Sequence, residues 1–181
     1  MTNFPRDSIV KAIHDGIKGD IRLLLENERL RGALLLTLSG IDTMAFLGMP
    51  ESQDDVTKSD FVAWADTYIK FPCDEQITGL ELYAARCAAL HAYGTESRLS
   101  REGRCRQIIW MSEAKPDIIY RPDKHPGIVV VAIPSLAQAF FAGVDRFLVN
   151  MYSDPSRSKL ADRRFNKIMH QLPGPGHETI V

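Results

Sequence analysis

The segment from Thr78 to Gly94 constrains the fold most strongly, because it reads as a single helix that is apolar on almost every side. Thr78 and Glu81 have the spacing of a capping box, which predicts where the helix begins. Gly94 suits the left-handed position that often follows a last helical turn. A helix without a polar face must be enclosed by other elements, so the sequence predicts a helical core around this segment.

Three further helices are predicted upstream, and with this segment they give a four-helix core over about residues 8–95. The first is amphipathic, with Lys18 largely off its apolar stripe. The second is apolar on most sides and is expected to be central. The third begins at a capping box formed by Thr57 and Asp60. The predicted ranges are about residues 8–27, Arg29–Leu47 and about residues 57–71.

Beyond residue 95 the character of the chain changes, because β-branched runs replace the helical pattern. We expect a β elaboration over about residues 105–133, followed by C-terminal helices over about residues 134–171. Three strand-like runs predict a small antiparallel sheet: 107–111, 117–121 and 127–133. The predicted fold class is mainly α, a helical bundle with this sheet inserted before two C-terminal helices. At 181 residues, one domain spanning residues 1–181 is expected.

Two charged or titratable side chains, Arg86 and His91, lie within the apolar helix. A buried arginine is costly unless it is paired or faces a cleft. The two residues are five positions apart, so they point about 140° away from each other. Asp42 is a similar anomaly in the second helix, and an ion pair with Arg86 would hold the guanidinium in place. The alternative for Asp42 is a solvent-facing position or a local bond to a neighbouring hydroxyl.

A short basic segment follows the apolar helix. Arg98, Arg101 and Arg104 lie among Glu96 and Glu102, with a small excess of positive charge. These arginines are candidates for binding phosphate or nucleic acid because they come directly after His91. The alternative is a solvated loop without a ligand.

Composition and motifs exclude several classes of protein. The net charge of −1 gives no global signal for nucleic acid. Three cysteines without paired spacing, and no signal peptide, predict reduced thiols and a cytoplasmic location. The apolar stretch Ala33–Leu47 is too short to span a membrane, so no membrane partner is expected. There is no metal-binding or nucleotide-binding motif, and we expect neither a metal nor a cofactor.

Arg86, the four residues after it and His91 resemble the Arg-to-His motif of the HEPN superfamily, small helical domains found in many prokaryotic ribonuclease toxins. The resemblance covers about residues 8–95 and the C-terminal helices. It implies a metal-independent endoribonuclease with a toxin or defence role, in which Arg86 holds the phosphate and His91 acts as acid or base. It also implies a homodimer in which the Arg-to-His motif of one copy meets the motif of the other. RNA is then the substrate, and a protein antitoxin is a further partner.

The residues also support a second interpretation, in which the protein is a non-catalytic HEPN-like dimer that binds a partner. Arg86 is then a core arginine bonded to Asp42 or to helix carbonyls, and His91 is a satisfied core histidine. Exposure separates the two interpretations. A ribonuclease needs both side chains at a solvent-accessible cleft with the basic segment, whereas burial of either one excludes it.

Overall fold

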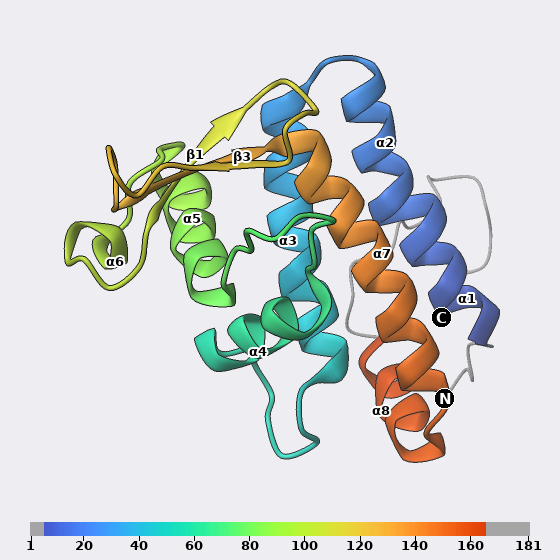
Figure 1. The fold of residues 1–181 in the computed structure, drawn as a ribbon. Coiled ribbons are helices and arrows are strands. Elements are labelled where there is room, and N and C mark those ends of the chain that lie inside the picture. Colours follow the sequence, from blue (N-terminus) through green and yellow to red (C-terminus); the bar gives the residue numbers. More distant parts are fainter. Residues whose placement is uncertain (1–5, 166–181) are drawn as a thin grey trace.

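Helices account for most of the chain, and a small sheet lies to one side of them (Figure 1). The computed structural model describes residues 6–165. The predicted mainly α class is confirmed, as is a small sheet placed between the core helices and the C-terminal helices. Residues 166–171, predicted as the end of the last helix, lie outside the described residues.

The N-terminal helix is a continuous run with a π-helical turn in its middle. It consists of α1 (Arg6–Lys11), the π-helix η1 (Ala12–Ile17) and α2 (Lys18–Glu26). Ile13 and Ile21 of its apolar stripe are buried, but so is Lys18, which was predicted to lie largely off that stripe. Lys18 is buried, and its Nζ donates a hydrogen bond of 2.7 Å to Asp145 Oδ1. The carboxylate supplied by another helix makes burial of this ammonium tolerable.

Helix α3 (Leu30–Gly48) is the central element of the bundle (Figure 1). It contacts α2 and four later helices: α4 (Lys58–Tyr68), α5 (Gly79–Ala92), α7 (Ile133–Tyr152) and α8 (Pro155–Phe165). Gly40 permits the close approach of α7, because a Cβ there would lie 2.6 Å from Phe140 Cζ. Among the described helices, only α3 is long and apolar enough to span a membrane. Its contacts with five helices account for that composition.

The two predicted capping boxes are both present. Thr57 and Asp60 begin α4, and Thr78 and Glu81 begin α5. The end of α5 differs from the prediction, because Tyr93 rather than Gly94 adopts the left-handed conformation, with φ 52°. The N–H of Gly94 then bonds the carbonyl of Ala88 at 3.1 Å, which satisfies one of the last free carbonyls of the helix.

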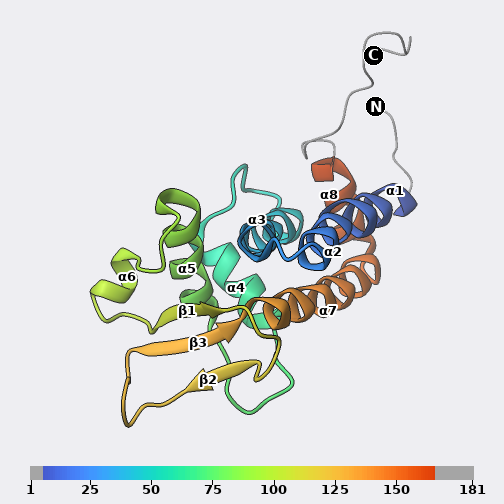
Figure 2. The same cartoon turned by 90° about the horizontal axis from the view of Figure 1, so that it is seen from above.

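The sheet contains β1 (Gln107–Met111), β2 (Ile118–Tyr120) and β3 (Ile128–Ala132), in the order β1-β3-β2 (Figure 2). β2 pairs antiparallel with β3, but β1 pairs parallel with β3, so the predicted all-antiparallel sheet is wrong. After β1 the chain crosses to the far edge of the sheet to form β2. It then returns as the middle strand, which must run in the direction of β1.

The C-terminal helices α7 and α8 pack back on the core, as predicted. Arg164 of α8 is buried, and its guanidinium donates to the carbonyls of Leu47, Met49 and Pro50 at the end of α3. The last carbonyls of a helix lack partners within the helix. An arginine from α8 therefore caps the central helix. A short helix that was not predicted, α6 (Arg98–Arg101), precedes the sheet.

Candidate functional site

The ion pair expected between Arg86 and Asp42 is present and joins α5 to α3. Arg86 Nε donates a hydrogen bond of 2.8 Å to Asp42 Oδ2. About a quarter of the Arg86 side chain is exposed to solvent, so the pair lies at the edge of the core. Asp42 therefore bonds Arg86 and not a neighbouring hydroxyl group. The hydroxyl of Thr43 donates a hydrogen bond to the carbonyl of Ser39 instead.

Burial and ion pairing shift the pKa values of Asp42 and Arg86 in opposite directions. Burial raises the pKa of Asp42, and the hydrogen bond and charge of Arg86 only partly offset this effect. Burial also disfavours the charged guanidinium, but the bond and charge of Asp42 outweigh that and raise the pKa of Arg86. Arg86 is therefore fully charged at neutral pH and held through Nε by a neighbouring helix.

His91 lies in the last turn of α5 and is exposed, so the interpretation of His91 as a satisfied core histidine is wrong. The buried face of α5 is formed by Glu81, Leu82 and the small residues Ala84, Ala85, Ala88 and Ala89. At about 100° per residue, Arg86 lies just beyond one margin of that face and His91 beyond the other. The structure therefore does not bring Arg86 and His91 together within one chain.

The outer surface of α5 between Arg86 and His91 borders a basic hollow. This hollow has a volume of about 260 Å³, and α4, α5 and the segment around α6 all contribute to it. Tyr83 and Cys87 of α5 form its apolar side. Ser97, Leu99 and three cationic side chains form the rest of its rim; the cations are Lys58, Arg98 and Arg104. Two of the three arginines predicted to bind phosphate thus lie beside the helix that carries Arg86.

Each arginine of the basic segment also has an acidic neighbour at the surface. Arg98 Nε lies 2.6 Å from Glu102, and Arg104 lies 3.8 Å from the same carboxylate. Arg101 lies 3.5 Å from Glu96. Exposed ion pairs of this kind contribute roughly 0–1 kcal/mol each. They therefore leave the arginines free to exchange a carboxylate for another anion.

Arg106 has a structural position that the sequence did not reveal. Its guanidinium bonds Glu81, Glu75 and the carbonyl of Gln76, and it stacks 4.5 Å from the ring of Tyr120. These contacts raise the pKa of Arg106 and tie the first turn of α5 to the sheet. Glu81 is 25 residues away from Arg106, so no local pattern connects them.

The described residues contain no group of three or more His, Cys, Asp or Glu side chains placed to hold a metal ion. All three cysteines are free thiols. Comparisons of the chain with protein-family models, with curated proteins and with solved structures found no match.

Proposed function

We propose that the protein is a metal-independent endoribonuclease of HEPN type that cleaves RNA at the surface of α5. Arg86 binds the scissile phosphate and stabilises the charge that develops on it. His91 accepts the proton of the ribose 2′-OH, because an imidazole titrates close to neutral pH. The 2′-oxygen then bonds to phosphorus and the bond to the 5′-oxygen breaks. His91 returns the proton to that oxygen, which leaves a 2′,3′-cyclic phosphate end.

One observation carries this proposal: a charged arginine, positioned by Asp42, lies beside a hollow rimmed by three further cations. A single phosphate needs only one or two such contacts, whereas a strand of RNA needs several spaced along its backbone. Arg86 supports the chemistry in this arrangement, and Lys58, Arg98 and Arg104 support binding of the flanking nucleotides. Arg101 lies on the same short helix and extends this surface.

The proposal requires two copies of the chain, since Arg86 and His91 point to opposite sides of α5. In a homodimer, Arg86 of one copy meets His91 of the other. The surface around His91 supports such a contact, because Leu90 and Tyr93 expose 40% and 64% of their area on the same helix end. Exposed apolar residues that cluster around a polar one are typical of interaction surfaces.

The first test is cleavage of a mixed RNA substrate in EDTA by wild type, Arg86→Ala and His91→Ala at matched folded concentration. We expect cleavage by wild type and loss of cleavage in both variants. Arg121→Ala and His125→Ala are the matched controls, because both residues are exposed and lie far from α5 in the sequence. Cleavage that persists in both Arg86→Ala and His91→Ala would show that the site lies elsewhere.

A second test asks whether each site is built from two copies. Mixing the inactive Arg86→Ala and His91→Ala proteins should restore about a quarter of wild-type activity, because half of the randomly formed dimers are mixed and each holds one complete site. Failure of the mixture, under conditions where subunits exchange, would contradict a shared site. A site contained in one chain would give no recovery.

The second candidate function is a non-catalytic dimeric binding module. It is favoured by the acidic neighbours of Arg98, Arg101 and Arg104, which reduce the local positive charge. Under this proposal the protein binds RNA or a protein partner through the same surface without cleaving RNA. Stable binding of uncut RNA by wild type, weakened by Arg98→Ala, would support it over the ribonuclease. A toxin role, with a protein antitoxin covering the α5 surface, belongs to the ribonuclease proposal alone.

A further inference from the structure

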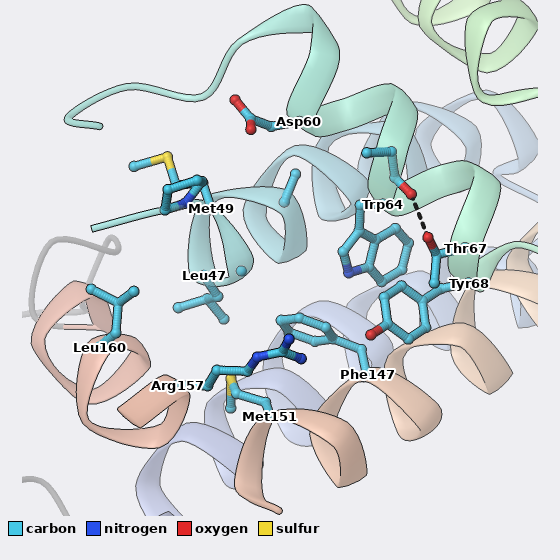
Figure 3. A pocket seen from close by; sticks show the side chains of 14 residues that line it. Leu47, Met49, Asp60, Trp64, Thr67, Tyr68, Phe147, Met151, Arg157 and Leu160 are labelled. Carbon is cyan, nitrogen blue, oxygen red and sulfur yellow. Dashed lines mark hydrogen bonds between the residues drawn. The ribbon is translucent and has the colours of Figure 1, made fainter. Parts of the chain in front are cut away.

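A second cavity, separate from the α5 surface, lies where the end of α3 meets α4, α7 and α8 (Figure 3). Its volume is about 350 Å³, which is within the range of small-molecule sites. Most of its lining is apolar or aromatic, with Leu47, Met151 and Leu160 from three different helices. Nothing in the proposed ribonuclease chemistry uses this cavity.

One wall of the cavity consists of three aromatic rings in contact with each other. The ring centres of Trp64 and Tyr68 are 5.1 Å apart, and Phe147 packs edge-on against both at 5.9 and 5.5 Å. Such a cluster holds its rings in fixed orientations. It therefore presents a rigid surface that suits a flat apolar molecule.

The indole N–H of Trp64 is the polar feature that most needs explanation. Trp64 is 95% buried, and Nε1 has no hydrogen-bond partner among the described residues. Figure 3 shows that the nitrogen edge of the ring faces the cavity. A buried donor without a partner destabilises the folded protein by roughly 1–3 kcal/mol, and native proteins contain few of them. An acceptor within the cavity would remove that cost.

A positive charge also lines the cavity. Arg157 of α8 lines the cavity, and Figure 3 shows its side chain extending from α8 toward the interior. Its Nε is 3.6 Å from Asp154, a loose surface pair that leaves the outer amino groups without a partner among the described residues. The carboxylate on the rim, Asp60, is already bonded to Thr57 and Gln53. The lining therefore offers a neutral donor, the indole N–H of Trp64, and a cation, the guanidinium of Arg157.

We propose that this cavity binds a planar aromatic carboxylate. The rings of Trp64, Tyr68 and Phe147 enclose the apolar body of the ligand, and the indole N–H and Arg157 bind its carboxylate oxygens. A cavity of roughly 150 Å³ holds benzene. One of about 350 Å³ therefore accommodates a bicyclic ring with its carboxylate.

The two tryptophans of the chain provide a direct readout of occupancy. In an NMR spectrum of ¹⁵N-labelled protein, each indole N–H gives one signal, and Trp110→Phe assigns them. Titration with 2-naphthoate should shift the Trp64 signal downfield until it saturates, because its N–H gains an acceptor. The Trp110 signal should stay in place. A Trp64 signal that does not move at millimolar 2-naphthoate would overturn the proposal, as would movement of Trp110 alone.

Two variants test the roles of the charge and the donor. Arg157→Gln should weaken binding of 2-naphthoate about tenfold or more, because a charge-assisted hydrogen bond is lost. It should leave the weaker binding of 2-naphthamide unchanged. Arg163→Gln is the matched control, since Arg163 is also an exposed arginine of α8 with one surface ion pair. Trp64→Phe, confirmed as folded by its methyl spectrum, should weaken both ligands.

Equal affinity for 2-naphthoate and 2-naphthamide, unaffected by Arg157→Gln, would overturn the assignment of a carboxylate ligand. These measurements do not depend on RNA cleavage. An inactive ribonuclease with a saturable Trp64 signal would contradict the proposed function and support this one.

Discussion

At the scale of single residues, the site depends on charged groups that apolar helices tolerate only in pairs. Asp42 lies in α3 and Arg86 in α5, and the bond between them positions a cation at the edge of the core. Both side chains remain partly exposed, so the pair combines orientation with access to solvent. Lys18 and Asp145 form a similar pair on the other side of the bundle, although there the ammonium is sealed from solvent.

Removing Asp42 should destabilise the fold and impair the site together. We expect Asp42→Ala to lower the free energy of unfolding by about 1–3 kcal/mol, because Arg86 loses a charged partner at a partly buried position. Asp42→Asn should cost less, because the amide oxygen still accepts from Nε and the negative charge, which burial disfavours, is gone. Urea unfolding measures both, with the exposed Asp54→Ala as control. Wild-type stability in Asp42→Ala would contradict the role of the pair.

Tyr93 should carry a conformational cost that glycine would remove. Its φ of 52° lies in the left-handed region, which costs a residue with a Cβ about 1–2 kcal/mol. Because its side chain is mostly exposed, we expect Tyr93→Gly to raise the free energy of unfolding by about 1 kcal/mol. Tyr93→Ala is the comparison, since it removes the ring and keeps the strain. Greater stability of the alanine variant would show that strain is not the controlling factor.

At the scale of elements, α5 is fixed at its start and open at its end. The capping box and the bonds from Arg106 secure its first turn, whereas its last turn carries the exposed His91. Burial alone would raise the pKa of Glu81, but the hydrogen bonds from Arg106 and Thr78 outweigh burial and hold it below its ordinary value. An exposed residue at the end of such a helix is accessible from solvent without any change in the core.

The Glu81 network should make stability depend on pH in the acidic range. A carboxyl with a lowered folded pKa stabilises the protein above its unfolded value, which is 4.5 for glutamate here. That contribution is lost as the pH falls through the lower folded pKa. We therefore expect the free energy of unfolding to fall as the pH drops below 4.5 and through the lower folded pKa of Glu81. Glu81→Gln should flatten this dependence, and Glu96→Gln, an exposed carboxylate near α6, should not. An equal dependence of the unfolding free energy on pH in the two variants would contradict this role of Glu81.

At the scale of the whole molecule, α4 connects the two candidate sites. Lys58 at its start borders the basic hollow, and Trp64 one and a half turns later forms the wall of the aromatic cavity. α4 also packs against α3, α5 and α7, so its position is shared by both sites. One helix therefore contributes lining residues to both hollows.

Local patterns in the sequence predicted much of the fold. The capping boxes at Thr57 and Thr78 gave the starts of α4 and α5, because capping depends on residues three positions apart. The pairing of Asp42 with Arg86 was also predictable, since each is a charged residue within an otherwise apolar stretch of its helix, away from the first turn. A cytoplasmic location, RNA, an antitoxin and a homodimer remain predictions.

Features that depend on distant pairing were not predictable. Whether β1 lies parallel to β3 depends on the path of the chain between them, which no strand propensity encodes. The buried positions of Lys18, Arg106 and Arg164 depend on partners from 25 to 127 residues away. The orphan N–H of Trp64 became visible only when the surrounding helices were in place.

The cap on α3 has a consequence for the order in which the chain matures during synthesis. Arg164 follows Met49, whose carbonyl it binds, by 115 residues. At about 5–20 residues per second, a ribosome needs on the order of ten seconds to make that stretch. Throughout this time the central helix has been made, but its carbonyl end is exposed to water. The helix that four later helices pack against is therefore capped only when the last of them leaves the ribosome.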